Sequence, residues 1–224
     1  MRCDPLHQPF HRHDQARLIV FVRGDYRERA IEGQSRFRPG DFIIRPALFA
    51  HDGFGSPDAA YRTLPVSRAA WTRVHADHGW SVRTGRLPAE LITDPEALMH
   101  TGDVVLSDCP TKAVEPAGDR TRLDRIARAL VQPSATPTGE LAEEEGLRPW
   151  QLTRRFLDRY GLTPTRFRQQ ARLQTALKLM AETSLSLAAI AADAGFADQS
   201  HFCRSLRTAT GQSPSDTRRA LLVA

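Results

Sequence analysis

The clearest hydrophobic pattern along the chain lies near its C-terminal end, within residues 184–219. Four apolar residues recur there at the spacing of one buried helix face: Leu187, Ile190, Ala191 and Ala194. Gly195 then interrupts the pattern, because glycine adopts a left-handed backbone without steric cost. A second helix is predicted to follow, with Phe202 and Leu206 four residues apart on its inner face. A helix, a glycine turn and a second helix make the helix-turn-helix pattern.

A second copy of this pattern lies upstream. Leu141-Ala142-x-x-x-Gly146-Leu147 matches Ile190-Ala191-x-x-x-Gly195-Phe196 at an offset of 49 residues. Five further positions match the C-terminal copy at an offset of 50 residues: Arg154, Phe156, Gly161, Thr163 and Pro164. Thr163 and its counterpart Ser213 each precede a proline and are predicted to cap the next helix. The sequence therefore predicts two helix-turn-helix modules.

Residues 163–182 connect the two modules and predict one long helix. After Pro164 the segment contains no glycine or proline and is rich in good helix formers. One apolar stripe runs along it: Leu173, Ala176, Leu177 and Met180. About 18 helical residues extend roughly 27 Å, and one turn of B-DNA is about 34 Å. Such a helix would set two recognition helices into successive major grooves, although the stripe would also suit an ordinary bundle helix.

Eight polar or aromatic side chains are predicted on the outer faces of the two recognition helices: Arg148, Trp150, Gln151, Arg154, Gln199, Ser200, His201 and Arg204. Arginine can bind guanine, glutamine can pair with adenine, and tryptophan offers an apolar surface to thymine methyl groups. Two alternatives stay open. Ser200 and Asp198 could instead cap the helix, and Arg154 and Arg204 could contact phosphate without reading sequence.

The C-terminal motif resembles a known family. Ile190-Ala-x-x-x-Gly195-Phe196, Gln199-Ser-His-Phe202-x-Arg204 and Gly211-x-Ser-Pro-x-x-x-Arg218 are together similar to the second DNA-binding module of the AraC/XylS family of bacterial transcription regulators. The resemblance implies a double-stranded DNA operator as partner, and RNA polymerase if the protein is an activator. It also implies a sensor domain before the DNA-binding part.

Charge separates the two halves of the chain. Residues 1–118 hold 15 basic and 15 acidic residues, whereas residues 119–224 hold 16 and 11, a net charge of 16 − 11 = +5. The excess falls where phosphate contact is predicted. The helix predicted over 137–145, capped by Thr136, is unusually acidic, so its glutamates should face away from DNA.

The N-terminal half predicts short strands. Residues 18–22 and 42–44 are apolar and β-branched, residues 25–38 alternate and turn at Gly33, and further strands are expected near 61–66 and 80–87. Short strands between glycine and proline turns favour a small β-barrel or jelly roll. The fold class is α+β: an N-terminal β-barrel over 1–88, a linker over 89–119 with a short dimerisation helix over 88–99, and an all-α domain over 120–224.

The histidines of this half resemble the cupin motifs. His11-x-His13, Arg17 and Gly24 follow the spacing of the first motif, and Gly40-x(5)-Pro46-x-Leu48-x-x-His51 follows the second. The resemblance implies a cupin-like effector barrel whose pocket holds His11, His13, Arg17 and His51. Two positions depart from the motif, since Arg17 stands at the glutamate ligand and Leu48 at a glycine.

Three interpretations of the histidine cluster stay open. His11, His13 and His51 would suffice to ligate Zn, Fe or Ni with a water completing the shell. The charge of Arg17 would oppose a divalent cation and favour an anionic organic effector such as a carboxylate. Hydrogen bonding of the histidines at the barrel mouth, without any ligand, is the third reading. His75-x-x-His78 is expected on the surface.

Composition narrows the class of protein. Cys3, Cys109 and Cys203 are odd in number and scattered, so no disulfide framework or CxxC pair is expected. No apolar run approaches 18 residues and no signal peptide is apparent, so a cytoplasmic location without membrane contact is expected.

We expect a DNA-binding transcription regulator, not an enzyme, whose barrel binds a small effector and which is a monomer or homodimer. The alternatives are a cupin metalloenzyme using His11, His13 and His51, and a DNA-binding protein whose barrel serves only for dimerisation.

Overall fold

The computed structural model describes residues 6–91, 98, 100–114, 121–132 and 136–223. The chain divides into two compact units, one of residues 1–28, 35–115 and 219–224, and one of residues 29–34 and 116–218. The first is rich in sheet and the second is helical, so the class is mixed α and β, as predicted.

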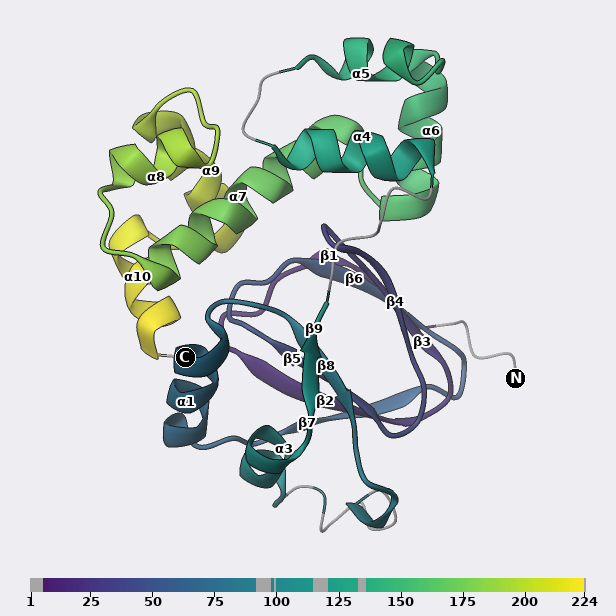
Figure 1. The fold of residues 1–224 in the computed structure, drawn as a ribbon, viewed down its shortest axis with the longest axis vertical. Coiled ribbons are helices and arrows are strands. Elements are labelled where there is room, and N and C mark those ends of the chain that lie inside the picture. The colour runs from purple at the N-terminus through teal and green to yellow at the C-terminus, as the bar shows by residue number, and fades with distance from the viewer. Residues whose placement is uncertain (1–5, 92–97, 99, 115–120, 133–135, 224) are drawn as a thin grey trace. The chain divides into compact units, whose positions relative to one another are not determined.

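Two antiparallel sheets form the N-terminal half (Figure 1). The four-stranded sheet has the order β1 (Leu6–His11), β6 (His51–Gly55), β3 (Tyr26–Ala30) and β4 (Gly33–Phe37). The five-stranded sheet has the order β7 (Ala60–Leu64), β2 (Arg17–Arg23), β5 (Asp41–Arg45), β8 (Arg83–Arg86) and β9 (Thr111–Ala113). Neither sheet closes on itself among the described residues.

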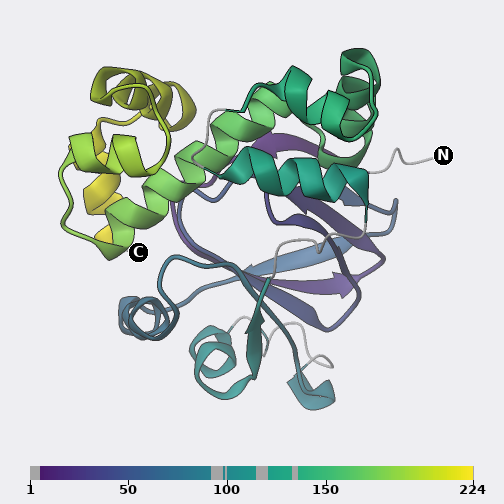
Figure 2. The same ribbon diagram turned by 45° about the horizontal axis from the view of Figure 1, so that its top comes forward.

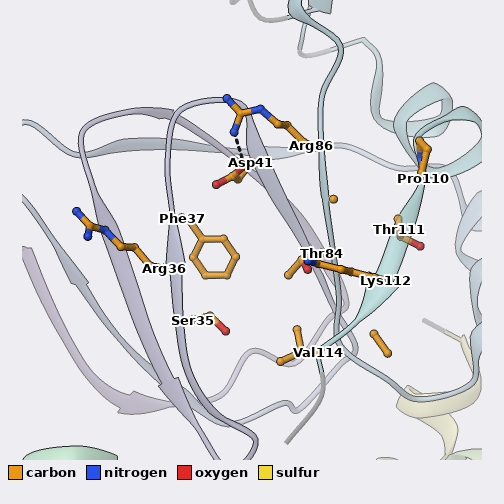
Figure 3. Close-up of a pocket in the computed structure, with 12 residues that line it drawn as sticks. Ser35, Arg36, Phe37, Asp41, Thr84, Arg86, Pro110, Thr111, Lys112 and Val114 are labelled. Carbon is orange, nitrogen blue, oxygen red and sulfur yellow. Dashed lines mark hydrogen bonds and ion pairs between the residues drawn. The ribbon is translucent and has the colours of Figure 1, made fainter. Parts of the chain in front are cut away.

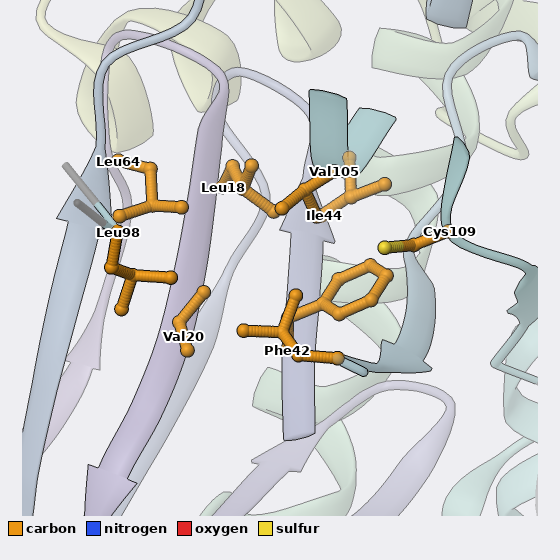
Figure 4. Packing of buried hydrophobic residues seen from close by; sticks show 9 residues of the cluster. Leu18, Val20, Phe42, Ile44, Leu64, Leu98, Val105 and Cys109 are labelled. Atoms are coloured by element: carbon orange, nitrogen blue, oxygen red, sulfur yellow. The ribbon is translucent and has the colours of Figure 1, made fainter. Parts of the chain in front are cut away.

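The central strands β2 and β5 are buried on both faces, which explains their nearly continuous apolar sequences. Successive side chains alternate between faces. One face packs into a core that includes residues from α3 and from the segments around it (Figure 4): Leu18, Val20, Phe42, Ile44, Leu64, Leu87, Leu98, Val105 and Cys109. The other face turns Arg17, Ile19 and Phe21 of β2 toward a cavity between the sheets. The alternation therefore makes the half-buried Arg17 part of the cavity wall.

The predicted strands at 18–22, 25–38, 42–44, 61–66 and 80–87 all overlap strands of the structure. Strands β1 and β6, by contrast, were not predicted. Strand β1 is polar and holds two histidines and a proline, and β6 holds Gly53 and Gly55, so both have low strand propensity. Antiparallel pairing between β1 and β6 stabilises both strands despite their low strand propensity.

The linker predicted over 89–119 contains regular structure in its described part. Helix α3 (Gly102–Asp108) buries Val105, and β9 completes the five-stranded sheet. Helix α1 (Arg68–His78), capped by Ser67, carries His75 and His78 in its last turn. Of the helix predicted over 88–99, a short 3-10 helix η1 (Ala89–Leu91) is present, whereas 92–97 and 99 lie outside the described residues, as does Cys3.

The described residues from 121 onward form seven helices: α4 (Arg122–Val131), α5 (Thr138–Glu144), α6 (Pro149–Tyr160), α7 (Pro164–Glu182), α8 (Leu187–Asp193), α9 (Gln199–Thr210) and α10 (Pro214–Val223). Helix α7 lies between the other helices, with α4 and α6 packed at one end and α8 and α9 at the other (Figure 2). Thr163 and Ser213 cap α7 and α10 as predicted. Helix α5 has Pro137 rather than Thr136 at its N-cap position, without a side-chain hydrogen bond.

A buried carboxylate joins α4 to α6. Asp124 is 2% exposed and accepts hydrogen bonds from Arg159 Nη2 at 2.7 Å, Tyr160 Oη at 2.9 Å and Thr121 Oγ1 at 2.8 Å. Burial by itself would raise the pKa of Asp124, but these hydrogen bonds and the charge of Arg159 outweigh it and hold that pKa below its usual value. The stabilisation is therefore present at neutral pH and is lost as pH falls through the pKa of the folded state.

We expect Asp124→Asn to lower the free energy of unfolding at pH 7 by about 1.5–3 kcal/mol, the range for hydrogen bonds to a charged group. Urea denaturation followed by circular dichroism measures this loss. Asp158→Asn, at an exposed position of helix α6, is the matched control and should change stability little. Equal stability of the Asp124 variant and the unsubstituted protein would contradict a structural role for this carboxylate.

Candidate DNA-reading helices and histidine pocket

The two helix-turn-helix modules have the same turn. In the first, Gly146 has φ of +65° and Leu147 N donates to Ala142 O at 2.8 Å. In the second, Gly195 has φ of +79° and Phe196 N donates to Ala191 O at 2.9 Å. The internal sequence repeat is therefore a repeat of backbone geometry, with glycine where the left-handed conformation is required.

The inner faces of the recognition helices α6 and α9 are buried. Helix α6 buries Leu152, Phe156 and Tyr160, and α9 buries Phe202, Ser205 and Leu206. Phe196 is also in the core, 5.2 Å from Phe202 between ring centroids, as predicted. The buried faces fix which side of each helix remains outward.

Six of the eight predicted DNA-reading residues are exposed: Arg148, Trp150, Arg154, Gln199, Ser200 and Arg204. Trp150 is 60% exposed, although indole is one of the more hydrophobic side chains. A large apolar ring held in solvent at the start of a helix, between arginines, is suited to contact with a base edge or a thymine methyl group.

The other two residues, Gln151 and His201, have contacts of their own. Gln151 is half-buried, and its Oε1 accepts a hydrogen bond from the backbone N of Arg148 at 3.0 Å, which caps α6. The half-buried His201 ring packs edge-on against Phe196 at 5.4 Å. Asp198, rather than Ser200, caps α9 by accepting from His201 N at 2.7 Å.

The acidic helix α5 directs one glutamate toward α4. Glu145, just after α5, accepts from Arg125 Nε at 2.6 Å and from its Nη2 at 2.5 Å. Glu140, Glu143 and Glu144 are exposed. The ion pair therefore neutralises only part of the acidic charge of the first module.

The second group of predicted residues converges between the two sheets. His11 lies at the end of β1, His51 at the start of β6 and His13 just beyond β1, and one ring nitrogen of each lies within 4.8 Å of the others. The Nε2 atoms of His11 and His13 are 3.2 Å apart. Sequence spacing thus located all three members of this cluster.

Two imidazoles of the cluster, His13 and His51, have lowered pKa values. Burial lowers the pKa of His51 to about 2, with a further contribution from Arg45, and burial also lowers the pKa of His13 to about 4, with a further contribution from Arg17. His11 Nδ1 lies 2.7 Å from the carbonyl oxygen of Pro9, which leaves its Nε2 toward the cluster. Nδ1 of the buried His51 has no hydrogen-bond partner among the described residues. No hydrogen bond within the described residues therefore competes with a ligand for Nδ1 of His51.

A cavity of about 110 Å³ adjoins the cluster and is lined by Gln8, His13, Arg17, Ile19, Phe21, Tyr26, Arg45, His51 and Tyr61. Arg45 is 3% exposed and forms a buried ion pair with Glu28. Gln8 links the two tyrosines, because its Nε2 donates to Tyr61 Oη at 2.9 Å and its Oε1 accepts from Tyr26 Oη at 3.2 Å. Arg17, which also lines the cavity, has neither a hydrogen bond nor an ion pair to any described residue.

Sequence reasoning missed Glu28, Arg45 and the two tyrosines. A signal was present, since Tyr26, Glu28 and Ala30 alternate along β3 as buried residues. A charged residue in the inward-facing register of a strand indicates a buried ion pair or a site.

Leu48 has φ of +63° and is the one non-glycine residue with positive φ in the described chain. It occupies the position where the cupin motif has glycine. The Leu48 N donates to His13 O at 2.7 Å, and Arg12 donates to Leu48 O. Leu48 therefore adopts the left-handed backbone that glycine favours, and its hydrogen bond holds the segment that carries His13.

A larger cleft of about 940 Å³ lies elsewhere, between β4 and the β8–β9 edge (Figure 3). Its walls carry Ser35, Phe37, Thr84 and Lys112, and Arg86 Nη1 pairs with Asp41 at 2.7 Å. None of the predicted site residues lines it.

Comparison with known proteins also identifies a helix-turn-helix domain in the part of the chain that holds the two modules. A family model described as a helix-turn-helix domain matches residues 141–220. The ornithine utilization regulator of Pseudomonas aeruginosa is 32% identical over 137 residues, 60% of this chain and 40% of that protein. The arabinose operon regulatory protein of Salmonella typhimurium is 26% identical over 189 residues, 81% of this chain and 64% of that protein. The ToxT structure from Vibrio cholerae O395 aligns with 98% of this chain at 11% identity and a TM-score of 0.46.

Residues 141–220 therefore form a helix-turn-helix domain. The relatives named above are regulatory proteins. The chain spans about 40% and 64% of the length of the two relatives described above. None of the described helices is long and apolar enough to span a bilayer.

We expect Arg204→Ala to weaken binding to a specific DNA site by about 1–3 kcal/mol, because the exposed guanidinium can donate hydrogen bonds to both O6 and N7 of a guanine. Fluorescence anisotropy on a selected site and on a scrambled duplex measures the loss. Arg62→Ala removes an equal charge from the exposed strand β7 and should leave both affinities unchanged. An equal loss on both duplexes would assign Arg204 to phosphate contact instead.

Proposed function

We propose that this protein is a sequence-specific DNA-binding transcription regulator whose N-terminal two-sheet domain binds a small effector that alters DNA binding. The observation that carries the proposal is the placement of two exposed recognition helices at opposite ends of one helix, α7. DNA is the partner that a repeated, outward-facing set of arginine, glutamine and tryptophan side chains fits best.

The length of α7 sets the expected operator. Its 19 residues correspond to about 28 Å at 1.5 Å per residue. Two recognition helices at this separation, each entering a major groove, would read half-sites about one helical turn or 10 base pairs apart on one face of the duplex.

In selection from random duplexes, we expect the protein to recover a bipartite site. Insertion of 5 base pairs between the two halves rotates one half to the opposite face and should reduce affinity at least tenfold. Insertion of 10 base pairs keeps both halves on one face and changes only their separation, so it tests whether α7 can span the longer distance. Log affinity should also fall steeply with log salt concentration, since arginines neutralise phosphates. Binding that tolerates the insertion of 5 base pairs and responds weakly to salt would overturn the proposal.

The effector part of the proposal is supported by the 110 Å³ cavity and its unpartnered groups, Arg17 and His51 Nδ1. The left-handed Leu48 supports a cupin-like arrangement of this domain. By linkage, effector and operator must change each other's affinity by the same factor. Dimerisation through this domain and contact with RNA polymerase belong to the same proposal and rest on the resemblance alone.

A divalent metal is a second candidate occupant. Three imidazoles whose ligand nitrogens lie within 4.8 Å of one another are a donor set that Zn, Fe or Ni accepts, with bonds to histidine of about 2.0–2.1 Å. The 3.2 Å separation of two Nε2 atoms matches two ligands of one ion at that bond length. The bond of His11 Nδ1 to Pro9 O orients the ring as an outer-shell partner does. Bound there, a metal would supply a positive centre with open coordination positions.

We expect purified protein to bind about one equivalent of Zn²⁺, and His51→Ala to weaken that binding at least tenfold. Elemental analysis and competition with a chromophoric chelator measure both quantities. His75→Ala, in the pair on α1, should leave the affinity unchanged. Zn²⁺ affinity that is insensitive to His51 would remove the metal from the pocket.

A further inference from the structure

The charges around the histidine cluster are uneven. Arg45 is neutralised within the domain by Glu28, and the side chains of both residues are 4% exposed. Arg17 lies opposite Arg45 on the neighbouring strand and lines the same cavity, but it has no acidic partner among the described residues. Beside the three imidazoles, the cavity is therefore lined by one arginine, Arg17, that no acidic side chain of the described residues neutralises.

The positive charge of Arg17 opposes the binding of a cation to the histidine cluster. A divalent ion held by His11, His13 and His51 would share a small, partly buried cavity with Arg17, and like charges repel strongly where water is scarce. In the cupin motif this position supplies a negatively charged glutamate ligand, so the replacement reverses its sign. An anion brought in from solution would restore the missing negative charge.

We propose that the cavity binds a divalent metal ion and a small carboxylate together, with the carboxylate lying between the metal held by the three histidines and the guanidinium of Arg17. Guanidinium groups bind carboxylates through two parallel hydrogen bonds. The open coordination positions left by three protein ligands accept oxygen donors. The inference rests on the metal candidate of the proposed function.

The rest of the cavity limits the ligand. Its volume of about 110 Å³ is far below the 300–1,000 Å³ of typical drug-sized pockets, so the carboxylate has only a few carbon atoms. The hydroxyl groups of Tyr26 and Tyr61 and the amide of Gln8 line the other side. These groups suit a ligand with a hydroxyl or keto oxygen next to its carboxylate.

Simultaneous binding predicts a reciprocal dependence. The carboxylate must raise the affinity for the metal by the same factor by which the metal raises the affinity for the carboxylate. A site for a metal alone would show no such dependence, and a site for an anion alone would bind the anion in the absence of metal.

The experiment measures Zn²⁺ affinity of the full chain with a chromophoric chelator, without additive, with 1 mM lactate and with 1 mM lactamide, the neutral counterpart of lactate. For the unsubstituted protein we expect lactate to raise Zn²⁺ affinity at least fivefold and lactamide to leave it unchanged. Arg17→Met should bind Zn²⁺ more tightly without additive, because the repulsion is gone, and should show less than a twofold effect of lactate.

Arg62→Met, on the exposed strand β7, is the matched control and should behave as the unsubstituted protein. If thermal melting shows that Arg17→Met is unfolded, Arg17→Lys replaces it and should reduce the lactate effect by keeping the charge without the two-pronged geometry.

Equal Zn²⁺ affinity with lactate and without it, an equal effect of lactamide, or absence of Zn²⁺ binding would each overturn the inference. The operator measurements described above are made without metal and decide separately whether the protein is a DNA-binding regulator.

Discussion

The fixed separation of the two recognition helices is the constraint on which the rest of the helical unit depends, and helix α7 imposes it. Its apolar stripe is buried along the whole length, from Phe167 to Met180. Each buried leucine contributes about 1.5–3 kcal/mol through the hydrophobic effect. Because the stripe packs against α4 and α6 at one end and α8 and α9 at the other, the same side chains stabilise the bundle and set the spacing of the modules. Helix α7 therefore acts both as a structural helix of the bundle and as a spacer between the two modules, so the two interpretations of its apolar stripe are compatible.

The N-terminal domain buries charged side chains in addition to its apolar core. An isolated ion inside a protein is costly unless it is paired. Glu28 meets this requirement for Arg45, and the depressed pKa values of His13 and His51 keep those imidazoles uncharged. Arg17 is the exception, and its lack of a partner is why we assign the domain a ligand instead of a purely structural role.

Much of the helical half could be predicted because its signals are local. Gly146 and Gly195 mark turns that only a left-handed backbone can make, and Thr163, Ser213 and Asp198 cap helices through their own side chains. The cluster of His11, His13 and His51 also followed from spacing. Strands β1 and β6, helix α3 and the Glu28–Arg45 pair did not, because each is stabilised by partners distant in sequence. The capping role of Gln151 was missed for another reason, since a helix-starting glutamine and an outward-facing one have the same sequence pattern.

The most direct measurement of the central claim is hydroxyl-radical footprinting of the protein on a selected operator. If α7 holds two recognition helices for one face of the duplex, two protected patches should appear on that face, centred about 10 base pairs apart. Loss of the Trp150 side chain should remove only the patch of the first module. A single protected patch, or two patches on opposite faces of the duplex, would contradict the account.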